Sequence, residues 1–256
     1  MLDFNNILSF YPKKQQTFKR NIIKEYLQYK ILDIIFSTKY AQKLVFVGGT
    51  AVRIAHNSYR FSEDLDFDNF SIKQNEFKDI SKIIKHQLEL EGYHAEIRNV
   101  LKNAFHCYIK FPSILFQTGL SNHKEEKILI QLDTEPQGYS YTPDKYLLNK
   151  FGIFRYINTP SAELLLSQKI SAVLTRKREK GRDFFDVVYL MSKTEPDFKF
   201  LKFRLNIGSK KELIKQLDQK TKKSNLKILA QDIEPFLFDP SQKTRVLYFR
   251  DWLKTL

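Results

Sequence analysis

The stretch FVGGTAVRIAHNSYRFSEDLDFDNF, residues 46–70, constrains the fold more than any other part of the sequence. The apolar run 44–47 stops at Gly48 and Gly49, which is typical of a buried strand entering a tight turn. Thr50 stands where a helix N-cap is expected, and the residues after it suffice for only a short helix. DLDFDNF then alternates polar and apolar residues with the period of a strand. The segment therefore predicts a strand, a tight turn, a short helix and a second strand.

The alternation places Asp64, Asp66 and Asp68 on one face of the second strand. Three carboxylates on one face repel one another, and a bound divalent cation would reverse the sign of that energy. Mg²⁺ suits such a face, because proteins usually hold it with one or two carboxylates and substrate phosphates. The alternative is an exposed strand edge decorated with charge, which is the better interpretation of an isolated Asp-x-Asp pattern.

The glycines before the helix add to the case for a phosphate site. A strand that ends in Gly48 and Gly49 and opens a helix at Thr50 presents backbone N–H groups to an anion. An ordinary strand-to-helix turn is the alternative for these glycines alone. Their conjunction with Arg60, Ser62 and the aspartates favours a phosphate site beside a metal-binding strand. That pair of sites is the minimum equipment of a nucleotidyl or phosphoryl transferase.

A third carboxylate is predicted on a neighbouring strand. Asp133 ends the apolar run ILIQL, so it lies at the end of a predicted central strand, where an unpaired charge is costly. We interpret Asp133 as a ligand of a second metal ion or as a general base. The alternative is that Asp133 only begins the turn before Pro136.

The helical second half contains a lysine that its position does not explain. If residues 161–176 form one helix, capped by Thr159 with Pro160 at its first position, Lys169 lies on an apolar stripe. One interpretation is that Lys169 binds a triphosphate as a point charge. The other is that the lysine extends its ammonium group past the edge of the core into water.

Two aspartates three residues apart follow in the next predicted helix. Asp183 either caps that helix or positions the hydroxyl group to which such a transferase would attach the transferred group. Asp186 has apolar neighbours in the sequence and is predicted to be buried. A buried carboxylate needs a partner, for which Arg182 and Lys169 are the nearest candidates. The basic residues around Arg178 and Arg182 are interpreted either as a solvated face or as phosphate ligands.

The rest of the chain predicts an α+β fold, in which a mixed sheet with helices precedes a C-terminal helical lobe. A helix with one apolar face is predicted at 18–36 and an amphipathic helix at 73–91. Strand-like runs are predicted at 94–116 and 124–135. After Pro136 the pattern changes to helices, with two of them divided near Gly181 and a basic helical remainder at 196–256. We place a boundary near 140–155, which gives a domain at 1–150 and a helical basic lobe at 151–256. We expect this lobe to complete a cleft beside the sheet that carries the aspartates.

Composition bears on partners and location. Lys and Arg number 43 against 29 Asp and Glu, a formal net charge of +14 that favours a polyanion such as nucleic acid. Lysine-rich genomic composition is an equally good explanation of this charge. A single cysteine, Cys107, fits a reducing compartment. Because no apolar run of about 18 residues and no signal-peptide pattern is present, we predict a cytoplasmic protein that does not associate with membranes.

Three of these segments resemble one known family. VFVGGTAVRIAHNSYRFSEDLDF resembles the first motif of the AbiEii/AbiGii-type toxin nucleotidyltransferases, a polymerase-β-like family of bacterial toxin–antitoxin and phage-abortive systems. NIIKEYLQYKILDIIF looks like the leading helix of that family, and KISAVLTRKREKGRDFFDVVYL resembles its lysine, arginine and RDxxD signature. The resemblance covers residues 20–70 and 160–190 well and residues 196–256 hardly at all. Val52 stands where the family usually has leucine, a conservative departure.

The resemblance implies Mg²⁺- or Mn²⁺-dependent transfer of a nucleoside monophosphate from a nucleoside triphosphate (NTP) to RNA, in some members to the 3′ end of tRNA. It also implies a toxin with a cognate antitoxin. Modification of a protein hydroxyl and an inactive fold acting as a binding partner are the alternatives. The positions that match the family are Gly48, Gly49 and Thr50 for phosphate, Asp64, Asp66 and Asp133 for metal, and Lys169, Arg178, Arg182, Asp183 and Asp186 for its third motif.

Overall fold

The computed structural model describes residues 3–102 and 104–256. Residues 1 and 2 lie outside it, as does residue 103, which belongs to the strand-like run predicted at 94–116. The chain forms two compact units, and the backbone passes between them several times. The first unit comprises residues up to Thr50, Ser62–Gly138 and Pro143–Thr159. The second comprises Ala51–Phe61, Tyr139–Thr142 and Pro160–Leu256. Each is described separately below.

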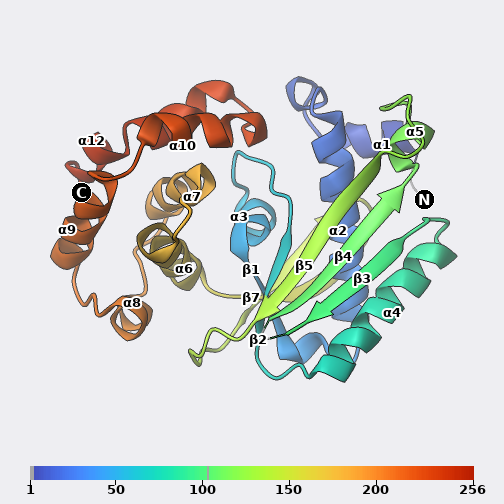
Figure 1. The fold of residues 1–256 in the computed structure, drawn as a ribbon, viewed down its shortest axis with the longest axis horizontal. Coiled ribbons are helices and arrows are strands. Elements are labelled where there is room, and N and C mark those ends of the chain that lie inside the picture. Colours follow the sequence, from blue (N-terminus) through green and yellow to red (C-terminus); the bar gives the residue numbers. More distant parts are fainter. Residues whose placement is uncertain (1–2, 103) are drawn as a thin grey trace. The chain divides into compact units, whose positions relative to one another are not determined.

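A mixed five-stranded sheet forms the centre of the first unit (Figure 1). Its strand order is β1-β2-β5-β4-β3, and β2 and β5 run parallel while the other neighbours are antiparallel. The sheet with its helices confirms the predicted α+β fold. The strands are β1 (Leu44–Val47), β2 (Leu65–Asn69), β3 (Glu96–Leu101), β4 (Phe105–Pro112) and β5 (Lys127–Glu135).

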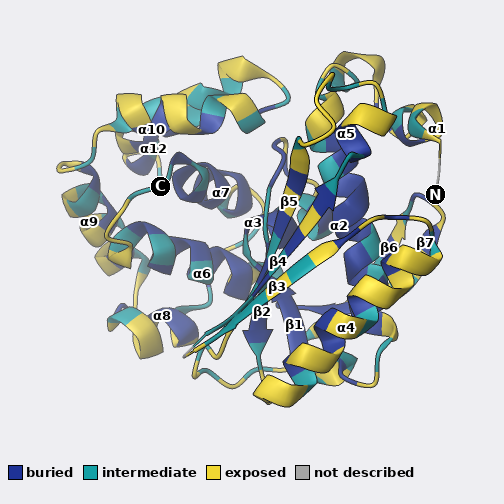
Figure 2. Ribbon diagram, turned by 45° about the vertical axis from the view of Figure 1, so that its right-hand side comes forward, coloured by how far each residue is buried: buried dark blue, intermediate teal, exposed yellow. Residues whose placement is uncertain are grey.

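The sheet has one buried face and one more exposed face. Along β5, Ile128, Ile130 and Leu132 are buried, whereas Leu129 and Asp133, which point to the other face, are not. Figure 2 shows this alternation of buried and exposed residues along the strands. Strand β4 follows the same pattern, and β2 follows it except at Asp68, which is buried. Polar side chains that function requires can therefore stand on the exposed face while the opposite face supplies the core.

Helices α2 (Lys19–Ser37) and α4 (Gln74–Leu90) contact the sheet and each other. Helix α4 is amphipathic as predicted, and it buries Phe77, Ile80 and Ile84. Helix α2 contains neither glycine nor proline, and most of its residues are buried, including Glu25. The prediction of a single apolar face was wrong for α2, because the helix contacts the five-stranded sheet and also a separate strand pair.

That strand pair is the part of the fold that sequence analysis missed. Strands β6 (Asp144–Lys150) and β7 (Ile153–Thr159) form an antiparallel hairpin, where a change to helices had been predicted. Its two-residue turn, Phe151 and Gly152, has positive φ at both positions, as a tight hairpin of the type I′ kind requires. The Phe151 ring packs edge-on against Tyr26 and Tyr29 of α2, which stabilises a backbone conformation unusual for phenylalanine.

Two short helices complete the first unit. They are α1 (Phe4–Ser9) and α5 (Ile114–Gln117), and single 3₁₀ turns lie at Lys13–Gln15 and Ala41–Lys43. Residues 114–116 had been included in a strand-like run, which was wrong. The strand β4 ends at Pro112, and Ser113 then adopts a positive φ of 62° that turns the chain into α5.

The second unit is helical. Its helices confirm both the division near Gly181 and the helical remainder. They are α6 (Ala162–Thr175), α7 (Gly181–Met191), α8 (Phe198–Leu205), α9 (Lys210–Thr221), α10 (Leu226–Ile233), α11 (Thr244–Leu247) and α12 (Phe249–Leu253), with 3₁₀ turns at Glu234–Phe236 and Pro240–Lys243. Helix α3 (Gly48–His56) contributes its residues from Ala51 onward to this unit.

The start of α6 differs from the prediction by two residues. Ser161, not Thr159, is the N-cap, and its hydroxyl accepts a hydrogen bond from the Leu164 N–H. Thr159 ends β7 instead. In the described part of the chain, no helix is both long enough and apolar enough to span a lipid bilayer.

Candidate active site

The glycine turn and the acidic strand meet in the first unit. Strands β1 and β2 are antiparallel with Val47 opposite Asp66, so the turn after Val47 comes back beside that aspartate. Gly48 has a φ of +78°, and a Cβ added to it would lie 2.0 Å from Asp66 Oδ2. The carboxylate of Asp66 therefore lies against the α-carbon of Gly48, a position that only glycine leaves open.

Thr50 fastens the same turn to the residue before β2. The Thr50 side chain is fully buried, and its hydroxyl donates a hydrogen bond to the carbonyl oxygen of Asp64. The predicted N-cap role of Thr50 was wrong, because α3 already begins at Gly48 and Thr50 lies in its first turn. The first turn of α3 has no acidic residue. Its N–H groups, which lack intrahelical partners, therefore remain suited to an anion.

Asp133 stands beside Asp66 on the adjacent parallel strand. The two residues are in register, and neighbouring strands are about 4.8 Å apart. Residues in register point to the same face, and here it is the more exposed one, since both aspartates are partly accessible. Asp64 precedes β2 and is also partly accessible. The structure thus brings together Gly48, Thr50, Asp64, Asp66 and Asp133.

Asp133 is held in place from two sides. His106 on β4 lies opposite Asp133, and its Nδ1 is 2.7 Å from Asp133 Oδ1. Gln131 donates from Nε2 to both carboxylate oxygens at 2.9 Å. Sequence analysis assigned no role to His106, because the pairing of β4 with β5 decides which histidine meets the aspartate. The alternation of His106 with apolar residues in β4 is the only signal, and it indicates the face but not the partner.

Asp68 has a different position from the two aspartates before it. It is 2% exposed, and its Oδ1 accepts a hydrogen bond from the Gln137 N–H at 3.1 Å. Asp68 therefore fixes the loop after β5, and it is not among the accessible carboxylates of the exposed face.

The donor set fits a hard divalent cation. Asp66 and Asp133 offer carboxylate oxygens from adjacent strands, which are the ligands Mg²⁺ prefers. Within residues 3–102 and 104–256, no group of three or more His, Cys, Asp or Glu side chains is already arranged around a metal position. An ion that takes its remaining ligands from substrate phosphates matches this arrangement better than one enclosed entirely by protein.

In the second unit, a buried ion pair joins the residues before β2 to α7. Arg60 is 1% exposed and Asp186 is 0% exposed. The guanidinium donates through Nε to Oδ1 at 2.8 Å and through one terminal nitrogen to Oδ2 at 2.6 Å. Asp186 is buried as predicted, and Lys169 is one of its partners at 2.9 Å. The other predicted partner, Arg182, was wrong, because Arg60 occupies that place.

Lys169 and Asp183 extend this network. The Lys169 ammonium is 3.4 Å from Asp183 Oδ1, and Arg176 approaches Oδ2 of the same carboxylate at 3.1 Å. Asp183 is not the N-cap of α7, since that position belongs to Lys180. The site candidates Lys169 and Asp183 therefore form one buried cluster with Arg60 and Asp186, and the exposed Arg176 contacts this cluster at its edge.

The charged state of the buried pair follows from its geometry. Burial alone would raise the pKa of Asp186, but attraction to Arg60 and Lys169 outweighs burial and holds that pKa below its ordinary value. Burial would likewise lower the pKa of Arg60, yet Asp186 raises it. Both groups therefore stay ionised, and each depends on the other for compensation of its charge.

The remaining predicted positions stand outside these clusters. Ser62 belongs to the first unit and is 9% exposed, and its carbonyl oxygen accepts from Gln28. Arg178 is exposed and Arg182 partly so, and neither has an ion pair with the part of the chain that the structure describes. Gly49 lies in the first turn of α3.

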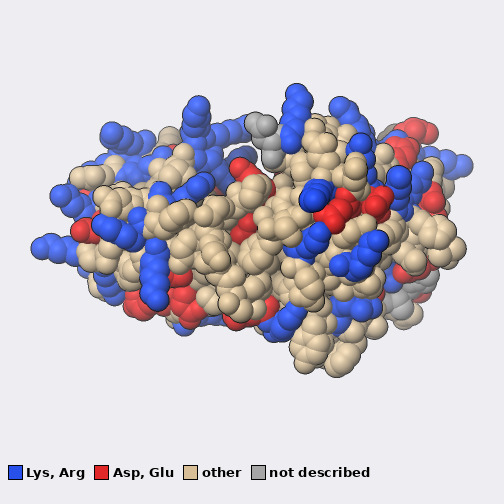
Figure 3. All heavy atoms as spheres, turned by 90° about the horizontal axis from the view of Figure 1, so that it is seen from below, with Lys and Arg blue, Asp and Glu red and all other residues tan. Residues whose placement is uncertain are grey.

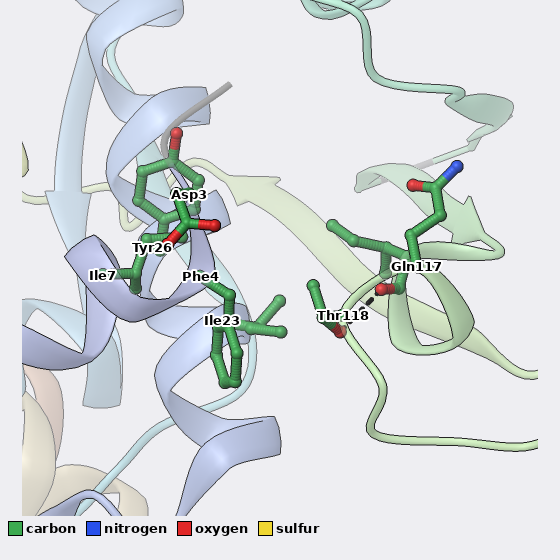
Figure 4. A pocket seen from close by; sticks show the side chains of 8 residues that line it. Asp3, Phe4, Ile7, Ile23, Tyr26, Gln117 and Thr118 are labelled. Carbon is green, nitrogen blue, oxygen red and sulfur yellow. Dashed lines mark hydrogen bonds between the residues drawn. The ribbon is translucent and has the colours of Figure 1, made fainter.

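A cavity of about 130 Å³ in the first unit is not part of this site (Figure 4). It lies between α1, α2 and α5 and is lined mainly by apolar side chains such as Ile7, Ile23 and Ile114. Helix α5 precedes the start of β5, whereas Asp133 lies near the end of that strand. The cavity therefore adjoins the other end of the sheet from the paired aspartates.

The fold resembles solved structures from Helicobacter pylori. The protein JHP933 matches with a TM-score of 0.56 and 16% identity over 92% of both chains. A candidate nucleotidyltransferase of the same organism matches with a TM-score of 0.57 and 16% identity over 92% of this chain and 95% of that one. Curated proteins yield no match. At this identity the likeness shows the fold alone, a mixed sheet with many helices that extends over most of both chains.

The family is shown by the sequence. Residues 30–253 match the family described as nucleotidyl transferase AbiEii toxin, type IV TA (toxin–antitoxin) system. The chain belongs to this family of toxin nucleotidyltransferases, as the three motifs had indicated. Membership implies an antitoxin partner.

The contact between Gly48 and Asp66 predicts the effect of adding one methyl group. Gly48→Ala must accommodate positive φ, at about 1–2 kcal/mol, and displace the Asp66 carboxylate as well. Gly92→Ala is the matched control, because Gly92 has a φ of +85° with nothing within 4 Å of an added Cβ. Urea unfolding should show the larger loss for Gly48→Ala. Equal losses would contradict the close contact.

The buried ion pair predicts a large and pH-dependent loss of stability. Asp186→Ala leaves Arg60 buried with its principal partner removed and should cost about 3–5 kcal/mol in unfolding free energy. The matched control is Asp251→Ala, whose partner Lys254 is 73% exposed, and it should cost under about 1 kcal/mol. Because the pKa of Asp186 is lower in the folded state, its ionisation stabilises the fold at any pH above the pKa of the unfolded state. This stabilisation disappears as the pH falls through the pKa of the folded state. The deficit of Asp186→Ala should therefore shrink in acid, and a deficit independent of pH would contradict the ionised pair.

Proposed function

We propose that the chain is a divalent-metal-dependent enzyme that transfers a nucleoside monophosphate from an NTP to RNA, at the 3′ end of tRNA, and acts as the toxin of a type IV system. The observation that carries the proposal is the position of Asp66. Its carboxylate lies against the Gly48 turn and in register with Asp133. A phosphate-binding turn beside paired carboxylates is what NTP-dependent transfer requires.

The proposed roles follow from this geometry. N–H groups of Gly48, Gly49 and Thr50 donate to phosphate oxygens of the NTP. Asp66, Asp133 and Asp64 hold Mg²⁺ or Mn²⁺, which supplies neutralisation of phosphate charge when it is bound.

The transfer itself exchanges one phosphorus–oxygen bond for another. The acceptor hydroxyl oxygen bonds to the α-phosphorus, and the bond from that phosphorus to the pyrophosphate oxygen breaks. The hydroxyl proton passes to Asp133, whose orientation His106 and Gln131 fix through the hydrogen bonds described above. Asp183 is an alternative group for positioning the hydroxyl, although Lys169 and Arg176 both engage it.

We propose a different role for each basic candidate. Lys169 has three N–H donors, of which Asp183 and Asp186 take two, so one remains for a phosphate oxygen. Arg60 spends Nε and both terminal nitrogens on Asp186 and the Phe61 carbonyl oxygen, which supports a structural role in place of direct nucleotide binding. Ser62, Arg178 and Arg182 keep their predicted role as phosphate ligands. A cytoplasmic location, where RNA is abundant, completes the proposal.

Transfer of a labelled nucleotide tests the proposal. The purified chain is incubated with total RNA, Mg²⁺ and each radioactive NTP in turn, and label is expected in RNA of tRNA size. Asp66→Asn should reduce transfer at least about 100-fold, because it removes a metal-binding charge without changing shape.

The control lies on the same strand. Asp68→Asn keeps an oxygen that can accept the Gln137 N–H and should transfer nucleotide nearly as fast as the unsubstituted chain. Transfer by Asp66→Asn at the original rate would refute the metal assignment. Label in polypeptide would mean a protein acceptor, and no label in any product would mean an inactive fold.

A further inference from the structure

The positive charge of the chain is concentrated at its C-terminal end. Residues 196–256 contain 14 Lys and Arg against 7 Asp and Glu, a net charge of +7 out of +14 for the whole chain. Uniform lysine enrichment would not place half of the excess in under a quarter of the length. Figure 3 shows Lys and Arg side chains projecting at its left, the side on which Figure 1 draws α8 and α9.

A shallow hollow lies within this region of the second unit. Its basic lining residues come from the turn after α9, from the start of α10 and from α12. The complete lining is Thr221, Lys222, Lys223, Ser224, Asn225, Leu226, Lys227, Leu247 and Arg250, which we call the basic hollow. None of the described residues that line it is an Asp or a Glu. It therefore presents mainly cations and the Asn225 amide to anything that lies across it.

Nearby carboxylates compensate only part of this charge. Asp218 pairs with Lys222 at 2.6 Å and lies 3.9 Å from Arg250, so one acid serves two bases. Lys223 and Lys227 are exposed and make no ion pair with the described residues. Glu179 accepts a hydrogen bond from Ser224 of the lining at 2.6 Å, but it also pairs with Lys220 at 3.1 Å. Four lining cations against these two shared carboxylates leave a local excess of positive charge. Such an excess attracts a polyanion and becomes favourable when the polyanion displaces its counterions.

The geometry of the hollow favours a sugar-phosphate backbone over a lipid surface. A membrane-binding surface presents a continuous row of exposed apolar side chains beside its cations, whereas both apolar lining residues, Leu226 and Leu247, are partly buried. Tyr248, which follows Leu247 in the chain, is 57% exposed and offers an aromatic face of the kind on which bases stack. Flexible lysines are suited to phosphates as point charges.

We propose that the basic hollow binds the backbone of the RNA acceptor. This inference rests on the proposed function for the identity of the acceptor, but it concerns a surface separate from the residues assigned to the NTP. The hollow supplies affinity through phosphate contacts and little sequence preference.

Binding of total tRNA in the absence of NTP tests the inference. The variant carries Lys222→Gln, Lys223→Gln and Lys227→Gln. The matched control removes the same charge from α4 through Lys78→Gln, Lys82→Gln and Lys85→Gln, all exposed. The hollow variant should bind about tenfold or more weakly at physiological salt, and the slope of log affinity against log salt should fall by about 2. The control should change affinity less than about twofold.

Equal losses in the two variants, or none in either, would overturn the proposal, as would tighter binding of anionic phospholipid vesicles than of tRNA. Unchanged urea midpoints show that each variant is folded. The binding assay contains no NTP, so a negative result there is distinguishable from a failure of nucleotide transfer. If the unsubstituted chain transfers nucleotide but the two variants bind tRNA equally well, the role of the basic hollow is refuted and the proposed enzyme activity is not.

Discussion

The contact between the Gly48 α-carbon and the Asp66 carboxylate is the constraint on which the first unit's site depends. It requires antiparallel pairing of β1 with β2, a positive φ at Gly48 and no side chain at that position. Because the same carboxylate is in register with Asp133, the pairing of three strands fixes the Gly48 turn, the proposed phosphate site, and both acids together. Helices α2 and α4 and the hairpin β6–β7 contact strands of this sheet and so stabilise the arrangement.

A different interaction dominates the second unit. The pair Arg60–Asp186 is almost completely inaccessible to water, so its charges are compensated within the buried cluster, mainly by each other and by Lys169. Arg60 follows α3 in sequence and Asp186 lies in α7, so the pair fixes the segment between α3 and β2 within the helical unit. One motif, RFSEDLDF, therefore serves two purposes, with its arginine buried in one unit and its aspartates accessible in the other.

Local patterns predicted the elements that carry the motifs. The Gly48–Gly49 turn, the alternation in β2 and the helix α4 depend on residues adjacent in sequence, and the structure confirms them. Lys169 was predicted as a partner of Asp186 and is one. His106 as the partner of Asp133 and Arg60 as the second partner of Asp186 were beyond prediction, because they are 27 and 126 residues away in the sequence. The hairpin β6–β7 was missed although KYLLNKFGIFRYINT alternates, because its lysines, asparagines and exposed aromatics obscure the apolar period.

Binding of Mn²⁺ followed by electron paramagnetic resonance tests the central idea most directly, because it reports the metal without requiring transfer. A cation shared between the carboxylates and a triphosphate should bind more tightly when a non-hydrolysable NTP analogue is present. Asp66→Asn and Asp133→Asn should each abolish that gain, whereas Asp68→Asn should retain it. A Mn²⁺ affinity that changes neither when the analogue is added nor when Asp66 is replaced would contradict the account.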